Sequence, residues 1–182
     1  MIQPALYRFT VKDYECMGRA GILPEDARVE LLDGEIYAMT PIGPKHSFAV
    51  AQLVERFVLS LSGQVMVVSQ SPIHLSAHSE PEPDIVLLRL PRERYQERLP
   101  RAEDILLLIE VADSSLAYDR NKKLPVYATA GIPEVWILDL NENRLEVYRK
   151  PQGERYGALT TYAEGERVAP LAFAEHALEW WR

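Results

Sequence analysis

Two isolated acidic residues stand beside apolar runs, where a carboxylate is not expected without a partner. Asp84 precedes the apolar residues 85–88, and Glu110 follows the apolar residues 105–109. Both runs predict buried strands. Because an ionised carboxylate is costly to bury, each acid is expected to meet a metal ion, a cation or several hydrogen-bond donors. With Lys123 in the next polar segment, these residues suit a site that hydrolyses phosphodiesters with a bound metal ion.

Spacing alone does not pair the two acids, because 26 positions separate Asp84 from Glu110. Their predicted strands are consecutive, however, and consecutive strands usually lie side by side. If the strand ends are adjacent, the two carboxylates can share Mg²⁺ or Mn²⁺, which prefer oxygen ligands and accept phosphate oxygens. The ion would polarise the phosphoryl oxygen and lower the pKa of an attacking water. A lysine would stabilise the developing charge or orient that water.

Three side chains share one face of the helix predicted for residues 119–130. Asp119, Lys123 and Tyr127 occupy positions i, i+4 and i+8, which lie above one another on a helix. They either support the site or form a surface ion pair above a packed tyrosine.

Another helix is predicted at residues 44–61, where a broad apolar stripe that includes Phe48 and Val58 is expected to be buried. His46 lies in the first turn of this helix. There it either lines the rim of the site or only caps and packs the helix.

The pattern of elements predicts one domain, residues 1–182, of mixed α/β (α+β) class, with a central mixed sheet flanked by helices. An N-terminal β-hairpin is expected at residues 28–39, because Asp33-Gly34 is a strong turn signal. The remaining elements are a helix at 10–21 and strands at 65–68, 73–75, 85–88, 105–111, 134–140 and 144–148. Residues 160–162 and the Trp180-Trp181 tail are expected to complete the sheet edge or a dimer surface.

Composition and charge exclude several classes of protein. The 182 residues carry a net charge of −7, which counts against a protein that coats nucleic acid non-specifically. It leaves room for a nuclease with local cations, for which the arginine-rich residues 89–101 are the best candidates, although a solvated polar face is the simpler explanation for each of them. The single cysteine, Cys16, forms no intramolecular disulfide or thiolate cluster. No apolar run approaches the ~20 residues of a membrane span and no signal-peptide core is present, so a cytoplasmic protein is expected.

Several short motifs occur in the order and spacing of a known family. They are the ELLDGE segment at 30–35, His46 at a helix start, Pro83-Asp84-Ile85, Glu110-Val111, Asp119-Arg120 with Lys123 and Tyr127, and the GIPEVWI segment at 131–137. With these motifs the chain, over roughly residues 10–148, resembles the Uma-type endonucleases of the PD-(D/E)xK superfamily. The resemblance implies a restriction-endonuclease-like core.

The same resemblance implies a role for each site residue. Asp84 and Glu110 would be the metal ligands, and Glu30 an additional acid near the metal. Lys123 would be the catalytic lysine, displaced onto the next helix. The usual place for that lysine, two residues after the second acid, is occupied here by Ala112.

The function predicted from these residues is a Mg²⁺- or Mn²⁺-dependent endonuclease that hydrolyses DNA, with RNA left open as the substrate. Gln70, at a strand end on the side of the site, resembles a superfamily position that contacts water or phosphate. By analogy with the fold, a homodimer is expected. The alternative is a catalytically silent nucleic-acid-binding or regulatory module, which the net charge and Ala112 favour. A glycosidase is disfavoured, because no aromatic cluster accompanies the two acids.

Overall fold

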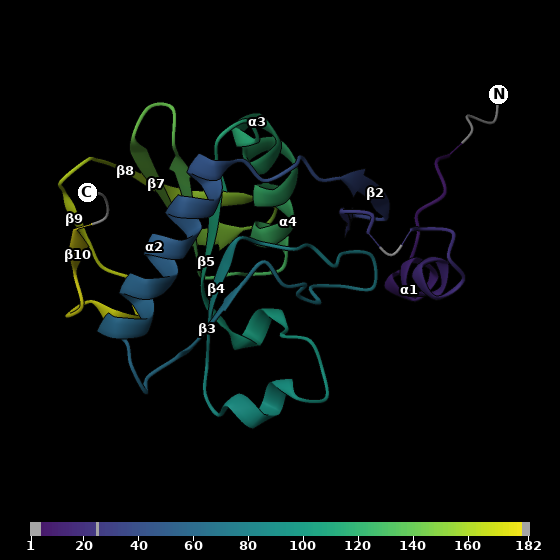
Figure 1. Ribbon diagram of the computed structural model, residues 1–182, viewed down its shortest axis with the longest axis horizontal. Coiled ribbons are helices and arrows are strands. Elements are labelled where there is room, and N and C mark those ends of the chain that lie inside the picture. The colour runs from purple at the N-terminus through teal and green to yellow at the C-terminus, as the bar shows by residue number, and fades with distance from the viewer. Residues whose placement is uncertain (1–4, 25, 180–182) are drawn as a thin grey trace.

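A six-stranded mixed sheet with helices on both faces forms the centre of the molecule (Figure 1). The computed structural model describes residues 5–24 and 26–179, so the expected Trp180-Trp181 surface lies outside the described residues. The strand order is β3-β4-β5-β6-β7-β8. The strands are β3 (Met66–Ser69), β4 (Ile85–Leu88), β5 (Ile105–Ala112), β6 (Glu134–Asp139), β7 (Arg144–Gln152) and β8 (Arg155–Ala163). The α+β class expected from the sequence is confirmed.

Strand β5 lies inside the sheet and is buried along its whole length. It pairs antiparallel with β4 and parallel with β6, while the other neighbouring strands of the sheet are antiparallel. Leu107, Ile109 and Val111 pack in the same core as helix α2 (Pro44–Ser60), whereas Leu108 and Ala112 pack in the opposite core. Because side chains alternate along a strand, Glu110 points to the face opposite α2.

Helix α2 covers one face of the sheet (Figure 1). It begins with Pro44 at its first turn and buries Val50, Leu53 and Phe57 against the core. The small sheet of β9 (Arg167–Val168) and β10 (Leu178–Glu179) contributes to the same core. The expectation that Phe48 and Val58 belong to the buried stripe is wrong, because they are 60% and 48% exposed. At 3.6 residues per turn they lie on the side of the helix away from the buried residues.

The opposite face of the sheet is covered by a helix with a widened turn. It consists of α3 (Leu116–Tyr118), the π-helical turn η3 (Asp119–Lys123) and α4 (Leu124–Thr129). It therefore begins before the predicted residue 119. The backbone N–H of Leu124 donates to the Asp119 carbonyl, five residues back, and Pro125, which follows, has no N–H to donate. The widened turn accommodates the proline, and such turns often occur at functional sites.

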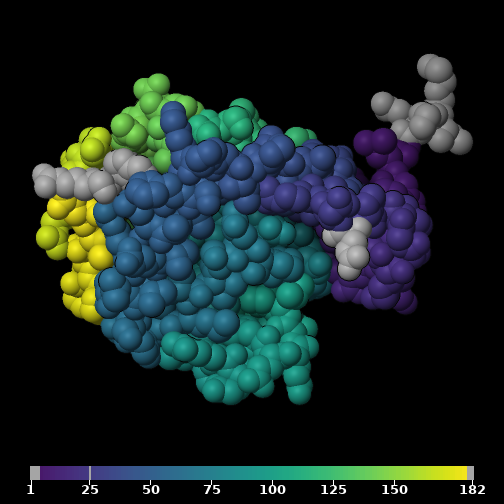
Figure 2. Space-filling model, in the orientation of Figure 1, coloured from purple at the N-terminus to yellow at the C-terminus, as the bar shows by residue number. Residues whose placement is uncertain are grey.

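The predicted hairpin is confirmed, with β1 (Val29–Leu32) paired to β2 (Glu35–Ala38). Asp33 and Gly34 both have positive φ, as the two-residue turn requires. Helix α1 (Val11–Arg19) begins at Thr10, whose side chain forms a capping box with Asp13. Figure 2 shows α1 and the hairpin at one end of the molecule and the β9–β10 strands at the other. The hairpin joins the rest of the chain through Leu31, which exchanges backbone hydrogen bonds with Glu80.

The arginine-rich connection between β4 and β5 lies at the far end of these strands from Asp84. Strand β4 starts after Asp84, and the connection leaves from its other end, where it protrudes at the bottom of Figures 1 and 2. Arg94 and Arg98 form ion pairs with Asp104, which is fully buried. These two arginines therefore hold the connection together, away from the predicted site.

Two smaller findings complete the fold. Residues 73–75 form no named strand, because His74 makes only an isolated bridge to Arg101. Within residues 5–24 and 26–179, every helix is too short or too polar to cross a membrane.

Candidate active site

The sheet register places the two predicted acids side by side. Ile85 of β4 is paired with Ile109 of β5. Asp84, one residue before Ile85, therefore lies opposite Glu110, one residue after Ile109. Both acids line the same pocket. The two strand ends are therefore neighbours, as expected from the sequence.

Asp84 is held between the other strand and the start of α2. Its Oδ2 atom accepts a 2.8 Å hydrogen bond from the Val111 N–H, and its Oδ1 atom lies 3.0 Å from His46 Nε2. The hydrogen bond to Asp84 raises the pKa of His46, although burial opposes the shift. His46 thus fixes the orientation of Asp84.

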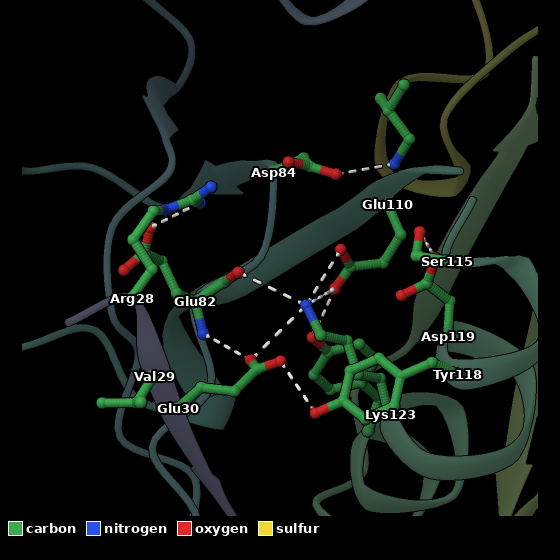
Figure 3. A network of polar contacts seen from close by, with 12 residues as sticks. Arg28, Val29, Glu30, Glu82, Asp84, Glu110, Ser115, Tyr118, Asp119 and Lys123 are labelled. Atoms are coloured by element: carbon green, nitrogen blue, oxygen red, sulfur yellow. Dashed lines mark hydrogen bonds and ion pairs between the residues drawn. The ribbon is translucent and has the colours of Figure 1, made fainter. Parts of the chain in front are cut away.

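Lys123 enters the same region from the π-helical turn and meets acceptors from three separate segments of the chain (Figure 3). Its Nζ atom lies 3.2 Å from Glu110 Oε1, 3.4 Å from Glu30 Oε2 and 3.4 Å from the Glu82 carbonyl oxygen. The residue is only 4% exposed. The hairpin, the sheet and the helix are therefore joined at one ammonium group.

Two more of the predicted helix residues point to this site. The Tyr127 hydroxyl donates a 2.5 Å hydrogen bond to Glu110 Oε1, and Asp119, which is 3% exposed, accepts a 2.6 Å hydrogen bond from Ser115. Asp119, Lys123 and Tyr127 therefore share a buried face, and the alternative of a surface ion pair does not apply.

Negative charge exceeds positive charge in this buried region. Burial raises the pKa of Glu110 well above its usual range; Asp119 and Asp84 add to this effect, which Lys123 and Tyr127 oppose. Burial likewise raises the pKa of Asp119 to about 6, against the effects of Lys123 and the Ser115 hydroxyl. Burial disfavours the charged form of Lys123, but the surrounding carboxylates prevail and raise its pKa. Lys123 is consequently a cation that cannot compensate all of its acidic neighbours.

Most of these side chains line a pocket of about 310 Å³, while Tyr127 lies outside its lining. Six acids contribute to it: Glu30, Glu82, Asp84, Glu110, Asp113 and Asp119. His46 and Lys123 line it as well. Gln70 does not belong to the lining; its backbone N–H donates to the Asp84 carbonyl, and it lies at the end of β3.

Sequence reasoning missed several residues of this pocket. The Tyr118 hydroxyl donates a 3.0 Å hydrogen bond to Glu30 Oε1, and the Glu82 N–H donates to Glu30 Oε2. Arg28 also lines the pocket. A signal for Tyr118 was present, because Ser114-Ser115 is a typical helix start and places Tyr118 in the helix. Glu82 and Arg28 had no comparable signal.

The donor set of the pocket fits a hard divalent cation. Among residues 5–24 and 26–179, no three His, Cys, Asp or Glu side chains are grouped to hold an ion by themselves. Mg²⁺, however, is commonly held by one or two carboxylates, with waters and substrate phosphates completing its shell. Asp84 and Glu110 line one pocket, in which carboxylates outnumber cations, and they meet that requirement.

Comparison with known proteins agrees with the fold. The model of the Uma2 family, described as "Putative restriction endonuclease", matches residues 11–180. A crystal structure of "a putative nuclease belonging to DUF820" from Anabaena variabilis ATCC 29413 superimposes with a TM-score of 0.66 and 20% sequence identity, over 84% of this chain and 87% of that chain. No curated protein sequence matches the chain. The structural similarity confirms the expected restriction-endonuclease-like fold, and the match over residues 11–180 shows that the chain belongs to the Uma2 family.

Proposed function

We propose that this protein is a Mg²⁺- or Mn²⁺-dependent nuclease that hydrolyses phosphodiester bonds in DNA. One observation carries the proposal: Asp84 and Glu110 face the same pocket from neighbouring strands, with Lys123 beside them. Membership of a family described as "Putative restriction endonuclease" supports it.

Asp84 and Glu110 would hold the ion, which would supply a Lewis acid for the phosphoryl oxygen and lower the pKa of a water nucleophile. His46 holds Asp84 in position through the 3.0 Å contact. The Tyr127 hydroxyl and Lys123 do the same for Glu110. Because a metal site depends on the groups that orient its ligands, these contacts are part of the proposed machinery.

Lys123 acts in this mechanism by its charge. The surrounding carboxylates raise the pKa of Lys123 and so favour its protonated form. Its ammonium offsets the acids around the reacting phosphate. Glu30 keeps the ammonium in place, while Tyr118 orients Glu30. Glu30 is thus proposed to position the lysine, beside its expected role as an acid near the metal.

A catalytically silent nucleic-acid-binding module remains the second candidate, and one observation favours it. Lys123 has three N–H groups, and its three acceptors are Glu110, Glu30 and the Glu82 carbonyl. No N–H is therefore left for the reacting phosphate in this arrangement. A silent module would bind no Mn²⁺ at Asp84 and Glu110.

The test is calorimetric Mn²⁺ titration combined with cleavage of supercoiled plasmid. Asp84→Asn and Glu110→Gln should each abolish Mn²⁺ binding and cleavage while thermal unfolding stays cooperative. Glu93→Gln, an exposed acid in the β4–β5 connection, is the matched control and should behave as the wild type. Cleavage that survives both site substitutions would exclude the proposed mechanism.

The same preparation decides two related questions. Replacing the plasmid by single-stranded RNA tests the preference for DNA. The expected homodimer stays a prediction, and sedimentation equilibrium of the wild type tests it.

A further inference from the structure

The pocket needs a positively charged group with free donors if it is to receive a phosphodiester. Six carboxylates line it, and they repel the negative charge of a phosphate. Lys123 is nearly inaccessible, with 6% of its side chain exposed, and its N–H groups face Glu110, Glu30 and the Glu82 carbonyl. Apart from the proposed metal ion, a side-chain cation with free donors is therefore needed if the protein itself is to contact the phosphate.

Arg28 is placed to do so. It directly precedes β1 and lines the pocket together with Lys123. Its side chain is 36% exposed, and one guanidinium nitrogen donates a 3.1 Å hydrogen bond to the Thr40 carbonyl. The contact with Glu82 Oε1 is loose, at 4.0 Å. A guanidinium has five N–H groups, so most of its donors are open to a ligand.

The guanidinium of Arg28 lies at the side of the pocket that Glu82 and Asp84 line. Figure 3 shows its guanidinium extending past Glu82 toward Asp84, on the side of the pocket away from Lys123. The bond to Thr40 holds the side chain in place, so that little rotamer freedom is lost when a ligand binds. The planar fork matches two oxygens of a phosphate.

A second polar atom lies nearby without a partner. His46 Nδ1 is buried and, among the residues that the structure describes, has no hydrogen-bond partner, while its Nε2 atom is occupied by Asp84. His46 lines the same pocket as Arg28. Buried polar atoms are rarely left unsatisfied, and a ligand or an ordered water normally completes them. His46 Nδ1 can thus make one more polar contact beside the bond that Nε2 makes to Asp84.

We propose that Arg28 is the phosphate-binding residue of this pocket and receives the non-bridging oxygens of a nucleic-acid phosphodiester. The inference rests on the proposed function, because it names the group that holds the substrate of the same site. It assigns separate tasks to the two cations of the pocket: Lys123 holds Glu110, and Arg28 holds the substrate.

Binding of a short fluorescein-labelled DNA duplex, measured by anisotropy with Ca²⁺ in place of Mg²⁺, tests this role. Arg28→Gln should weaken binding roughly tenfold to a hundredfold, the usual loss for a hydrogen bond to a charged group. It should also reduce the slope of log Kd against log salt by about 1, because one phosphate contact is lost. A residue that only stabilises the fold would not change this slope.

The matched control is Arg92→Gln, which removes the same charge from the exposed β4–β5 connection. It should leave both affinity and salt slope at their wild-type values. If Arg28→Gln binds the duplex as Arg92→Gln does, the inference is wrong. Where thermal unfolding shows that Arg28→Gln does not fold, Arg28→Lys decides: a loss of about threefold or more supports the bidentate contact, and wild-type affinity overturns it.

Failure of the inference is distinguishable from failure of the proposed function. Mn²⁺ calorimetry on Asp84→Asn reports the metal site without any nucleic acid. Duplex binding that is insensitive to Arg28, in a protein that still binds Mn²⁺ through Asp84, rejects only the inference. A wild type that binds no duplex rejects the inference as well, and its Mn²⁺ titration then decides the proposed function separately.

Discussion

Lys123 Nζ lies 3.2 Å from Glu110 Oε1 in a region from which solvent is almost excluded, since both residues are less than 5% exposed. Removing one partner of such a pair leaves the other charge buried and uncompensated. We expect Lys123→Met to lower the free energy of unfolding by about 3–5 kcal/mol, measured by urea denaturation.

Mn²⁺ should restore part of the stability lost in Lys123→Met, because a bound cation supplies the positive charge that the acids lack. The midpoint of thermal unfolding should therefore rise more with Mn²⁺ in the variant than in the wild type. Equal shifts of the midpoint in the variant and the wild type would show that Mn²⁺ does not bind to the carboxylates that Lys123 contacts.

Tyr127→Phe should separate the orientation of Glu110 from the stability of the fold. The variant loses the hydrogen bond to Glu110 but keeps the buried ring. We expect its free energy of unfolding to fall by about 1–3 kcal/mol. Tyr156→Phe is the matched control, because its hydroxyl donates to the Ile132 carbonyl at 2.9 Å, outside the pocket. Both variants should be less stable in urea, and only Tyr127→Phe should weaken Mn²⁺ binding.

Gly34→Ala should destabilise the hairpin that carries Glu30. Gly34 has a φ of +74°, and a Cβ atom there would lie 2.7 Å from the Arg8 Cβ and 2.9 Å from its Cα. Gly21→Ala has nearly the same φ, +71°, with nothing within 4 Å, so it measures the backbone cost alone, about 1 kcal/mol. Urea denaturation should show a larger loss for Gly34→Ala. Equal losses would mean that the hairpin moves away from Arg8 at no cost.

Asp104 makes the stability depend on pH in the acid range. Burial alone would raise the pKa of Asp104, but hydrogen bonds from Arg98, the local backbone and Arg94 lower it to about 2. Because the pKa of Asp104 is lower in the folded state, its ionised form stabilises the protein at pH values above its unfolded-state pKa, about 3.9. This stabilisation is lost as the pH falls toward 2.

Asp104→Asn should therefore be less stable than the wild type by about 1–2 kcal/mol at neutral pH. This loss is smaller than the free energy that corresponds to the whole pKa shift, because both arginines are partly exposed to solvent. The difference should shrink as urea denaturation is repeated at pH values falling from about 5 to about 2. Glu103→Gln, an exposed neighbour, should show no such trend. A difference that is constant with pH would contradict the assignment.

Local signals in the sequence were sufficient for most elements of the fold. The Asp33-Gly34 turn defined the hairpin, and the apolar run that precedes Glu110 defined the central strand, because each depends on neighbours in the chain. Phe48 and Val58 show the limit of this reasoning. Their hydrophobicity predicted burial, but the orientation of α2 is set by the sheet, and they face away from it.

The site could be predicted only in part, for a similar reason. Asp84 and Glu110 were recognisable because an acid beside an apolar run is unusual, and Lys123 because of its helical spacing from Asp119. The bonds from Tyr118 and Glu82 to Glu30 join segments that only the fold brings together. Arg94 and Arg98 looked like candidates for a nucleic-acid groove, but the buried Asp104 that holds them is adjacent to them only in space.

The long sequence distances across the pocket have a consequence for how the protein folds. Tyr118 and Glu30 are 88 positions apart, and Lys123 and Glu82 are 41 apart. Contacts of this kind require large loops to close first, which slows folding. No isolated segment of the chain can therefore assemble the pocket, and a divalent ion that recognises it will bind the native state alone. Such an ion would slow unfolding of the whole molecule. In refolding experiments, binding of the ion would report the formation of the native state.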